Sequence, residues 1–435
     1  MLYLQSSVTT ARERMMTMTT ELHILQDRTD LKQLSNEHAE FAAELRSSRL
    51  GIRAGRLALQ FCGLAGVNAA RSYVFLPRKS YSGVHKEDLQ TARLTMRVLA
   101  LFGRDMIDRL GVSVGGDGDT GRLALVAELA KDFLLYGIFF ERSRHATRNS
   151  GKPNWSRTII KEQAFIGNDG MVVYPNIRTT RSQNSHDSLL AQVQAAVMLE
   201  ITHQHGWWLE GLSSREDELK RYEPPRLPRT LWATHLRLLL PELYASRAIS
   251  LTNALISYLV NDPTSQSGET YYGVEDFHTV WEHMLRQVFV GVEAGWNSRL
   301  PRPAYFREDG SSSVQDRGLL TDIVLRDRSG TLHILDAKYY DATNIGNAPG
   351  LADIIKQFFY DIAVSSVAAG ESVRGCFVFP AMSGERHTFE LVTMQHRDGS
   401  TANEFPVVDC YYLDIVGVMK AYSEGRKIVF PARKE

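Results

Sequence analysis

Asp322, Asp336 and Lys338 are the residues of this chain whose types and spacing could perform chemistry together. Asp336 and Lys338 are two residues apart at the end of an apolar run, and Asp322 lies fourteen residues before Asp336. Side chains alternate between the two faces of a strand, so Asp336 and Lys338 are expected on one face. Two carboxylates held close together repel each other, and a bound divalent cation removes that repulsion.

A site of this composition predicts metal-assisted hydrolysis of a phosphodiester bond. Carboxylate oxygens suit Mg²⁺ (or Mn²⁺), and Mg²⁺ keeps several of its waters beside a phosphate substrate. An adjacent lysine can orient or deprotonate the attacking water and stabilise the developing charge. The plainer alternative is a surface hairpin in which Asp336 and Lys338 form a salt bridge, with Lys338 acting only as a structural counter-ion.

A β-hairpin must bring these residues together. Two β-rich runs flank the turn Arg328-Ser-Gly330, which is typical of a hairpin. Symmetric closure around residues 327–330 places Asp322 opposite residue 335, and therefore on the other face from Asp336. We expect either a bulge or a one-residue shift of register, and bulges are common beside active sites.

Apolar residues at helical spacing predict a helix on each side of the hairpin. The upstream helix runs from Phe277 to Phe289 and carries Glu282 at the border of its apolar stripe. The downstream helix runs from Leu351 to Ala363 and carries Gln357 and Tyr360. The alternatives are an exposed helical acid for Glu282, and helix-surface packing for Gln357 and Tyr360.

Two further features follow from the downstream helix. Lys356 lies one turn before Tyr360, so the two side chains are expected to be neighbours. A β-rich run, Gly375 to Pro380, comes next. The predicted order is therefore helix, strand, strand, helix, strand.

Asp322 followed by Asp336-Ala-Lys338 resembles the core motif of the PD-(D/E)xK nucleases. Two positions depart from the usual motif, because Thr321 replaces a proline and the second acid is aspartate rather than glutamate. The resemblance implies that Asp322 and Asp336 ligate the metal. It also implies that Lys338 positions the nucleophile and stabilises developing charge.

The flanking helices extend this resemblance. A glutamate often precedes the core in that superfamily, and Glu282 matches its place as a ligand of a second metal or of water. The segment Lys356-Gln-Phe-Phe-Tyr360 is similar to the glutamine–tyrosine element that follows the core. Gln357 and Tyr360 would then support the site or touch the DNA backbone.

Further segments resemble the LlaJI-type restriction endonucleases, which are relatives of the McrC nuclease subunit. The resemblance extends over about residues 55–420 and rests on five segments: Phe61–Gly66, Phe75–Arg78, Gly151–Ile159, Val280–Glu282 and Ile334–Tyr340. It implies double-stranded DNA as substrate and a separate McrB-like AAA+ GTPase as partner. No nucleotide-binding loop of Walker type occurs in this sequence.

Composition limits the remaining possibilities. The 435 residues carry no net formal charge, with 43% hydrophobic and 23% charged residues, as in ordinary soluble proteins. A neutral chain needs a local basic surface or a partner to attract DNA. The three cysteines, Cys62, Cys376 and Cys410, show no zinc spacing and indicate a reducing compartment. Without a long apolar run or a signal peptide, we expect a cytoplasmic protein that does not contact a membrane.

The predicted fold is α/β in the broad sense, an α+β multidomain chain with a restriction-endonuclease-like PD-(D/E)xK domain at its C-terminal end. Strands are expected at 57–66, 72–76, 159–166, 171–177, 389–394 and 407–413, and helices at 90–111, 121–143, 186–203, 231–259 and 412–424. The expected domains are a polar helical arm (1–50), a small β-containing and helical domain for DNA recognition or partner docking (51–150), a mostly helical middle domain (151–265) and the nuclease domain (266–435).

These observations predict a Mg²⁺-dependent DNA endonuclease of a restriction or phage-defence system. Two other functions stay open. One is a non-cleaving adaptor that stimulates a motor NTPase, and the other is a stand-alone DNA repair nuclease. A nucleotide requirement for cleavage separates the motor-coupled endonuclease from the repair nuclease, which would cut structured DNA without any nucleotide. The adaptor would instead stimulate the nucleotide hydrolysis of its motor without cutting DNA.

Overall fold

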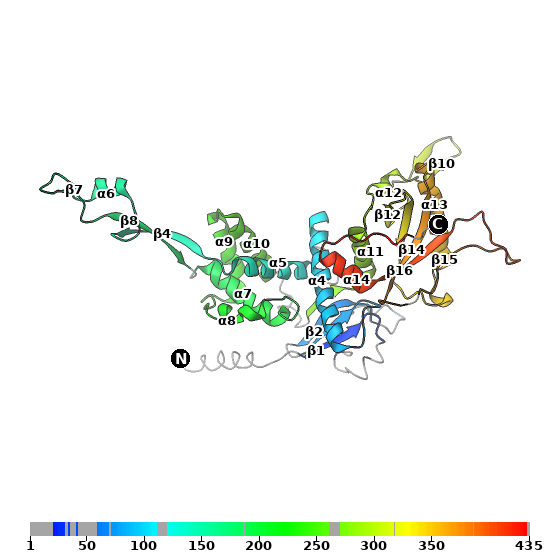
Figure 1. The fold of residues 1–435 in the computed structure, drawn as a ribbon, viewed down its shortest axis with the longest axis horizontal. Helices are drawn as coiled ribbons and strands as arrows, with labels where there is room; N and C mark the ends of the chain where they lie inside the picture. Colours follow the sequence, from blue (N-terminus) through cyan, green and yellow to red (C-terminus); the bar gives the residue numbers. More distant parts are fainter. Residues whose placement is uncertain are drawn as a thin grey trace. The chain divides into compact units, whose positions relative to one another are not determined.

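The computed structural model describes residues 21–30, 34, 41, 59–68, 71–110, 120–185, 188–260, 270–316, 318–385 and 387–432. It has the predicted mixed α/β character, with helices and several sheets (Figure 1). None of its helices, within those ranges, is both long enough and apolar enough to cross a bilayer.

Contacts divide the chain into two compact units. One combines Met1–Ala124 with Pro263–Glu435, and we call it the two-segment unit. The other, Leu125–Asp262, is the middle unit. The domain boundary expected at residue 266 lies outside the described residues. The two-segment unit holds all the predicted site residues.

The two-segment unit contains a four-stranded sheet in the order β1-β3-β2-β9, to which the first segment gives three strands and the second segment gives β9. The strands expected at 57–66 and 72–76 correspond to β2 and β3, which pair in antiparallel fashion. The helical expectation for residues 1–50 is wrong at β1, which is a strand parallel to β3; most of that arm lies outside the described residues. The strands are β1 (Glu21–Gln26), β2 (Cys62–Asn68), β3 (Arg71–Leu76) and β9 (Thr270–Val274).

Glycine is required where β2 and β9 approach each other. Gly63 lies opposite Gly273 in this pair, and Gly63 has a φ of 138°. A Cβ on Gly63 would lie 2.2 Å from the carbonyl oxygen of Tyr272. Any larger residue would therefore push the two strands apart.

Two helices follow, and the second ends earlier than predicted. α4 (His85–Leu110) and α5 (Thr120–Tyr136) correspond to the helices expected at 90–111 and 121–143. Gly137 ends α5 with a φ of 70°, and its N–H bonds to the Phe133 carbonyl, as is common at helix C-termini. The chain then enters strand β4 (Glu141–Arg148) rather than continuing the helix.

The middle unit contains a strand-rich segment and a group of helices. A strand was predicted from residue 159, but Trp155–Lys161 forms helix α6. The side chain of Asn154 caps it by accepting a hydrogen bond from the Arg157 N–H. The neighbouring strands are β5 (Lys152–Pro153), β6 (Phe165–Ile166), β7 (Val172–Val173) and β8 (Arg178–Ser185).

The helical predictions for the rest of this unit are confirmed. α7 begins after Ser188, whose side chain caps it, and the expected helical region 231–259 consists of two helices. The helices are α7 (Leu189–His205), α8 (Glu216–Leu219), α9 (Arg229–Leu239) and α10 (Ser246–Val260), with short 3₁₀ turns at Ser213–Arg215 and Leu240–Glu242.

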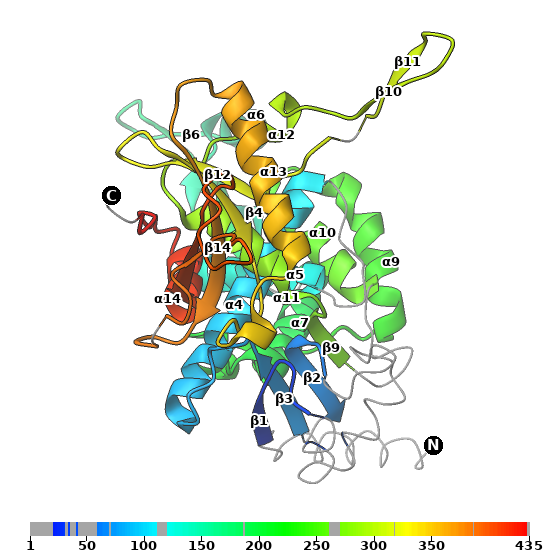
Figure 2. The same ribbon diagram turned by 90° about the vertical axis from the view of Figure 1, so that its right-hand side faces the viewer.

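A mixed five-stranded sheet, in the order β12-β13-β14-β16-β15, forms the other half of the two-segment unit (Figure 2). The predicted order helix, strand, strand, helix, strand is present. Its members are α11 (Phe277–Val288), β12 (Ile323–Arg326), β13 (Leu332–Ala337), α13 (Leu351–Val367) and β14 (Val373–Ala381).

The remaining elements extend or flank this sheet. β16 pairs with β14 and β15 with β16, so both predicted late strands join it. These elements are α12 (Trp296–Arg299), the hairpin β10 (Ala304–Phe306) and β11 (Ser312–Val314), a 3₁₀ turn at Ile345–Asn347, β15 (Leu391–Val392), β16 (Val408–Asp414) and α14 (Ile415–Ser423).

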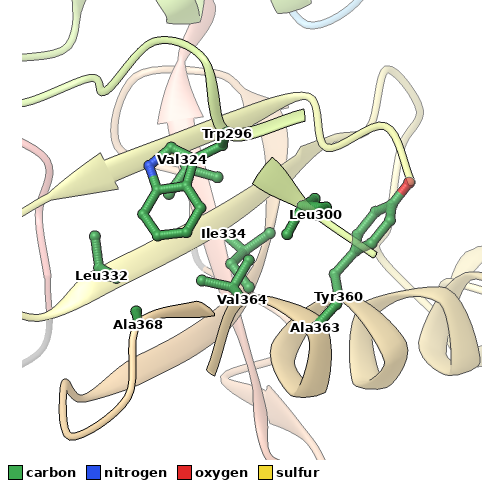
Figure 3. Packing of buried hydrophobic residues seen from close by; sticks show 9 residues of the cluster. All are labelled: Trp296, Leu300, Val324, Leu332, Ile334, Tyr360, Ala363, Val364 and Ala368. Atoms are coloured by element: carbon green, nitrogen blue, oxygen red, sulfur yellow. The ribbon is translucent and has the colours of Figure 1, made fainter. Parts of the chain in front are cut away.

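One face of the β12–β13 hairpin packs against α13 (Figure 3). Val324, Leu332 and Ile334 alternate with residues of the opposite face and meet Tyr360 and Val364 of the helix. Burial of these side chains fixes the register, since a one-residue slip would turn them away from the helix. Asp322 and Asp336 lie on the same face of the hairpin as Val324 and Ile334, at the edge of this apolar cluster.

Candidate active site

The register of the hairpin places Asp322 and Asp336 face to face. Ile323 pairs with Leu335 and Arg326 with Leu332 in an unbroken antiparallel ladder. Extending that ladder by one residue sets Asp322 directly opposite Asp336, on the same face. The sequence predicts either a bulge or a one-residue shift of register. The structure has the shift, and the paired residues contain no bulge.

The turn supplies that shift. The Asp327 carboxylate accepts hydrogen bonds from the backbone N–H groups of Ser329 and Thr331. Gly330 adopts a φ of 92°, a conformation that glycine tolerates best. The Asp327 N–H bonds back to the Thr331 carbonyl. The turn thus closes on residues 327 and 331, one position later than symmetric closure predicts.

Asp322 is held close to the carboxylate that it faces. Its Oδ2 accepts a hydrogen bond of 3.0 Å from the N–H of Ala337, the residue after Asp336. Burial raises the pKa of Asp322 to about 7, and the neighbouring charges of Asp336 and Glu282 act in the same direction. Carboxylates that converge in a buried place raise one another's pKa in this way.

Lys338 lies between two carboxylates. Its Nζ is 2.8 Å from Oδ2 of Asp336 and donates a 2.6 Å hydrogen bond to Oδ1 of Asp353. Burial by itself would lower the pKa of Lys338, but Asp336 and Asp353 outweigh burial and raise it. The side chain is therefore an ammonium ion. The ion pair between Asp336 and Lys338 that the plainer alternative predicted is present, but Asp336 is buried, so this is not a surface hairpin.

A second lysine approaches Asp336 from the helix. Nζ of Lys356 lies 3.7 Å from Oδ1 of Asp336, and it also lies over the Tyr360 ring, 5.2 Å from the ring centre. The sequence placed Lys356 next to Tyr360 but gave no reason to connect it with Asp336. The sequence does not single out Asp353 either, because a single acid in the first turn of a helix is common.

Glu282 and Arg286 form the side of the site that α11 contributes. The guanidinium of Arg286 pairs with the Glu282 carboxylate one turn earlier. It also donates a 2.6 Å hydrogen bond to the backbone carbonyl of Asp322. Arg286 therefore connects α11 directly to the strand that carries Asp322.

Gln357 and Tyr360 contact the protein backbone. Gln357 is buried, and its Nε2 donates a 3.2 Å hydrogen bond to the Cys376 carbonyl on β14. The Tyr360 hydroxyl donates to the carbonyl of Leu320, two residues before Asp322. In Figure 3 this hydroxyl points away from the apolar cluster. Both side chains connect α13 to strands of the site.

The oxygen donors fit a hard divalent cation. Oδ2 of Asp336 is buried and has no hydrogen-bond partner besides its ion pair with Lys338. Within the described residues, no three Asp, Glu, His or Cys side chains form a complete metal cage. Mg²⁺ does not need such a cage, because it is usually bound by one or two carboxylates together with water and phosphate.

A cleft of about 300 Å³ opens beside the site. Lys338 and Tyr340 line it together with Arg28, Gln60 and Glu275. Arg28 and Gln60 come from the N-terminal part of the chain, near β1 and β2. Segments next to the four-stranded sheet therefore contribute to the surroundings of the site, which the sequence did not indicate.

Two solved structures are among those to which this chain is similar. A half-complex of Thermococcus gammatolerans McrB AAA+ hexamers with bound McrC is 13% identical, with coverage of 94% of this chain and 99% of that chain and a TM-score of 0.43. The McrBC complex of the same organism is 12% identical, with coverage of 60% and 85% and a TM-score of 0.27.

Comparison with sequences gives a relative and a family. The BsuMI component YdjA of Bacillus subtilis (strain 168), named as a type II restriction enzyme component, is 28% identical over 197 residues. That match spans 42% of this chain and 39% of the relative. The LlaJI restriction endonuclease family matches residues 67–415, a range that includes Glu282 and all the residues gathered around Asp336. The chain therefore belongs to the LlaJI restriction endonuclease family.

Proposed function

We propose that this chain is a Mg²⁺-dependent (or Mn²⁺-dependent) DNA endonuclease with a PD-(D/E)xK domain, acting on double-stranded DNA in a restriction system. The observation that carries the proposal is the opposition of Asp322 and Asp336 across β12 and β13, with Lys338 beside them. Membership of a restriction endonuclease family gives that site its substrate class.

Each residue of the site has a separate task in this proposal. Asp322 and Asp336 hold the cation, and Glu282 holds a second cation or a water. When bound, the cation supplies Lewis-acid polarisation and a more acidic water. Arg286 keeps Glu282 and the Asp322 strand in place through its contacts with both.

Lys338 acts as a positive charge rather than as a base. Asp336 and Asp353 hold its ammonium group and raise its pKa, so a proton is costly to remove from it. A fixed ammonium beside the reacting phosphate can orient the nucleophile and stabilise charge on the oxygens of the transition state. Of the lysine roles predicted from the sequence, we therefore propose positioning of the nucleophile and stabilisation of charge, and not deprotonation of the water.

We also propose a separate AAA+ GTPase of McrB type as the partner. This part rests on the resemblance of the sequence to McrC relatives and on the lack of a Walker-type loop in the chain. Hydrolysis of a nucleotide by the partner would make cleavage depend on GTP.

Plasmid cleavage tests the proposal. Methylated and unmethylated plasmids are incubated with Mg²⁺, with and without GTP or ATP, and with a McrB-like protein where the genome encodes one. We expect wild-type protein to cut, and Asp336→Ala and Lys338→Ala to be inactive but folded by circular dichroism. Near wild-type cutting by either variant would refute the assigned site.

The same assay separates the other two functions. Cleavage of branched DNA without any nucleotide would indicate a stand-alone repair nuclease. No cleavage under any condition, together with stimulated hydrolysis by the motor, would indicate an adaptor.

A further inference from the structure

We propose that Lys356 is a second substrate-binding cation of the site, which contacts a phosphate oxygen of the DNA from α13. This inference rests on the proposed nuclease function and extends it to a residue outside the Asp…Asp-x-Lys motif. Lys356 would touch the substrate, whereas Lys338 remains held by protein carboxylates.

Two ammonium groups flank Asp336 from different elements. Lys338 follows β13 and lies 2.8 Å from Oδ2, whereas Lys356 comes from the second turn of α13 and lies 3.7 Å from Oδ1. The longer separation exceeds hydrogen-bond length. Lys356 is therefore near the reacting centre without being bound tightly to it.

The two lysines differ in their availability to a ligand. The Lys338 side chain is 14% exposed and has a second anchor, Asp353, at 2.6 Å. The Lys356 side chain is 41% exposed, and its ion pair with Asp336 is the long one. A phosphate from solvent can therefore bind Lys356 while breaking fewer and weaker contacts than it would have to break at Lys338.

Tyr360 fixes the direction in which Lys356 points. The ammonium group lies over the Tyr360 ring, a favourable cation–π position. The hydroxyl of the same ring donates to the Leu320 carbonyl, near Asp322. The ring thus positions Lys356 relative to the strand that supplies one of the opposed carboxylates.

The charge balance also favours a phosphate ligand. Carboxylates that ligate a cation attract a neighbouring ammonium less strongly, so Asp336 would release Lys356 when the site is loaded. A lysine ammonium binds phosphate as a compact point charge and needs no fixed fork geometry.

DNA binding and cleavage together test this role. Full-length Lys356→Gln and Lys356→Arg are compared with wild type and with Lys420→Ala, which removes an exposed lysine on α14. Binding of a fluorescent duplex is measured over a range of KCl concentrations, with Ca²⁺ replacing Mg²⁺. Cleavage is measured under the conditions in which wild type cuts.

We expect Lys356→Gln to lower kcat/KM about tenfold or more, as for a lost hydrogen bond to a charged group. The slope of log K against log[salt] should fall by about 0.9, the value for one phosphate contact. Lys356→Arg should keep the slope, and Lys420→Ala should behave as wild type. If Lys356 were only a structural counter-ion of Asp336, Lys356→Gln would lower thermal stability and leave the slope of log K against log[salt] unchanged.

The outcomes distinguish this inference from the function on which it rests. If wild type cuts, Asp336→Ala does not, and Lys356→Gln matches wild type in rate and slope, only the role of Lys356 is refuted. If nothing cuts but the slope still falls in Lys356→Gln, the phosphate contact stands and the nuclease proposal fails. Absence of DNA binding by wild type refutes the role of Lys356.

Discussion

Lys338 and Asp353 form an ion pair that ties the end of β13 to the first turn of α13, with 2.6 Å between Nζ and Oδ1. Asp353 has no place in the Asp…Asp-x-Lys motif, yet it supplies one of the two carboxylates that hold the lysine. In the proposed mechanism it would be a positioning residue, since it would act on the substrate only through Lys338.

Asp353→Asn should therefore lower kcat with little change in KM. The ammonium loses one of its two charged anchors, and misplacement of a catalytic group by about 1 Å can reduce a rate about a hundredfold. We expect a loss between about tenfold and a hundredfold, measured by steady-state cleavage. Glu128→Gln, at an exposed acid of α5, is the control. An unchanged kcat in Asp353→Asn would remove Asp353 from the mechanism.

The opposed aspartates should make stability depend on pH when no divalent cation is present. The pKa of Asp322 is raised by burial to about 7 in the folded chain, whereas an unfolded aspartate titrates near 3.9. Between these values the folded state binds more protons than the unfolded state, so stability falls as pH rises from about 4 to about 7.

Thermal unfolding in EDTA can follow this dependence. Asp322→Asn should lack the fall in Tm over that pH range, and at pH 7 it should be more stable than wild type. Mg²⁺ should raise the Tm of wild type, because ligands that bind the folded state stabilise it, and it should not raise the Tm of Asp322→Asn to the same extent. Parallel curves of Tm against pH for wild type and Asp322→Asn would contradict this account.

Tyr360→Phe should weaken the attachment of α13 to the segment before Asp322. The change removes the hydrogen bond to the Leu320 carbonyl, which is worth about 1 kcal/mol of unfolding free energy. We expect a smaller cleavage rate as well, because the carbonyl lies two residues from a proposed metal ligand. Urea unfolding measures the first effect, with Tyr244→Phe, at a tyrosine that is 91% exposed, as the matched control.

Trp281→Ala should destabilise the two-segment unit rather than act on chemistry. The side chain is 0% exposed, and removal of a buried tryptophan costs about 3 to 5 kcal/mol. Its indole N–H is buried without a hydrogen-bond partner, so Trp281→Phe should cost less. Trp155→Ala, at a tryptophan that is 51% exposed, should change stability little. Equal losses in all three variants would contradict this interpretation.

Much of the site follows from local sequence pattern. The two β-rich runs and the turn at Gly330 predict the hairpin, and the period of the apolar residues predicts α11 and α13. The register does not follow from these signals. It depends on how the Asp327 side chain closes the turn, and a difference of one residue reverses the face of Asp322.

The local sequence pattern does not predict side-chain contacts between one helix or strand and another. Asp353 and Lys356 reach Lys338 and Asp336 only because α13 lies on the face of the hairpin that carries Val324 and Ile334. Their sequence context shows two ordinary charges of a helix. The apolar, β-branched Ile159 and Ile160 predict a strand at residues 159–161, but the Asn154 cap starts a helix at Trp155 that runs through them.

The pairing of β9 with β2 has a consequence for how this protein can be dissected and for how it could change in evolution. The chain leaves the two-segment unit once and returns once, so the middle unit has the topology of an inserted cassette. A fragment cut at residue 266 would keep the opposed aspartates but leave β9 without β2, its partner. Replacing the cassette would preserve that pairing, so the middle unit can diverge while the opposed aspartates stay in place.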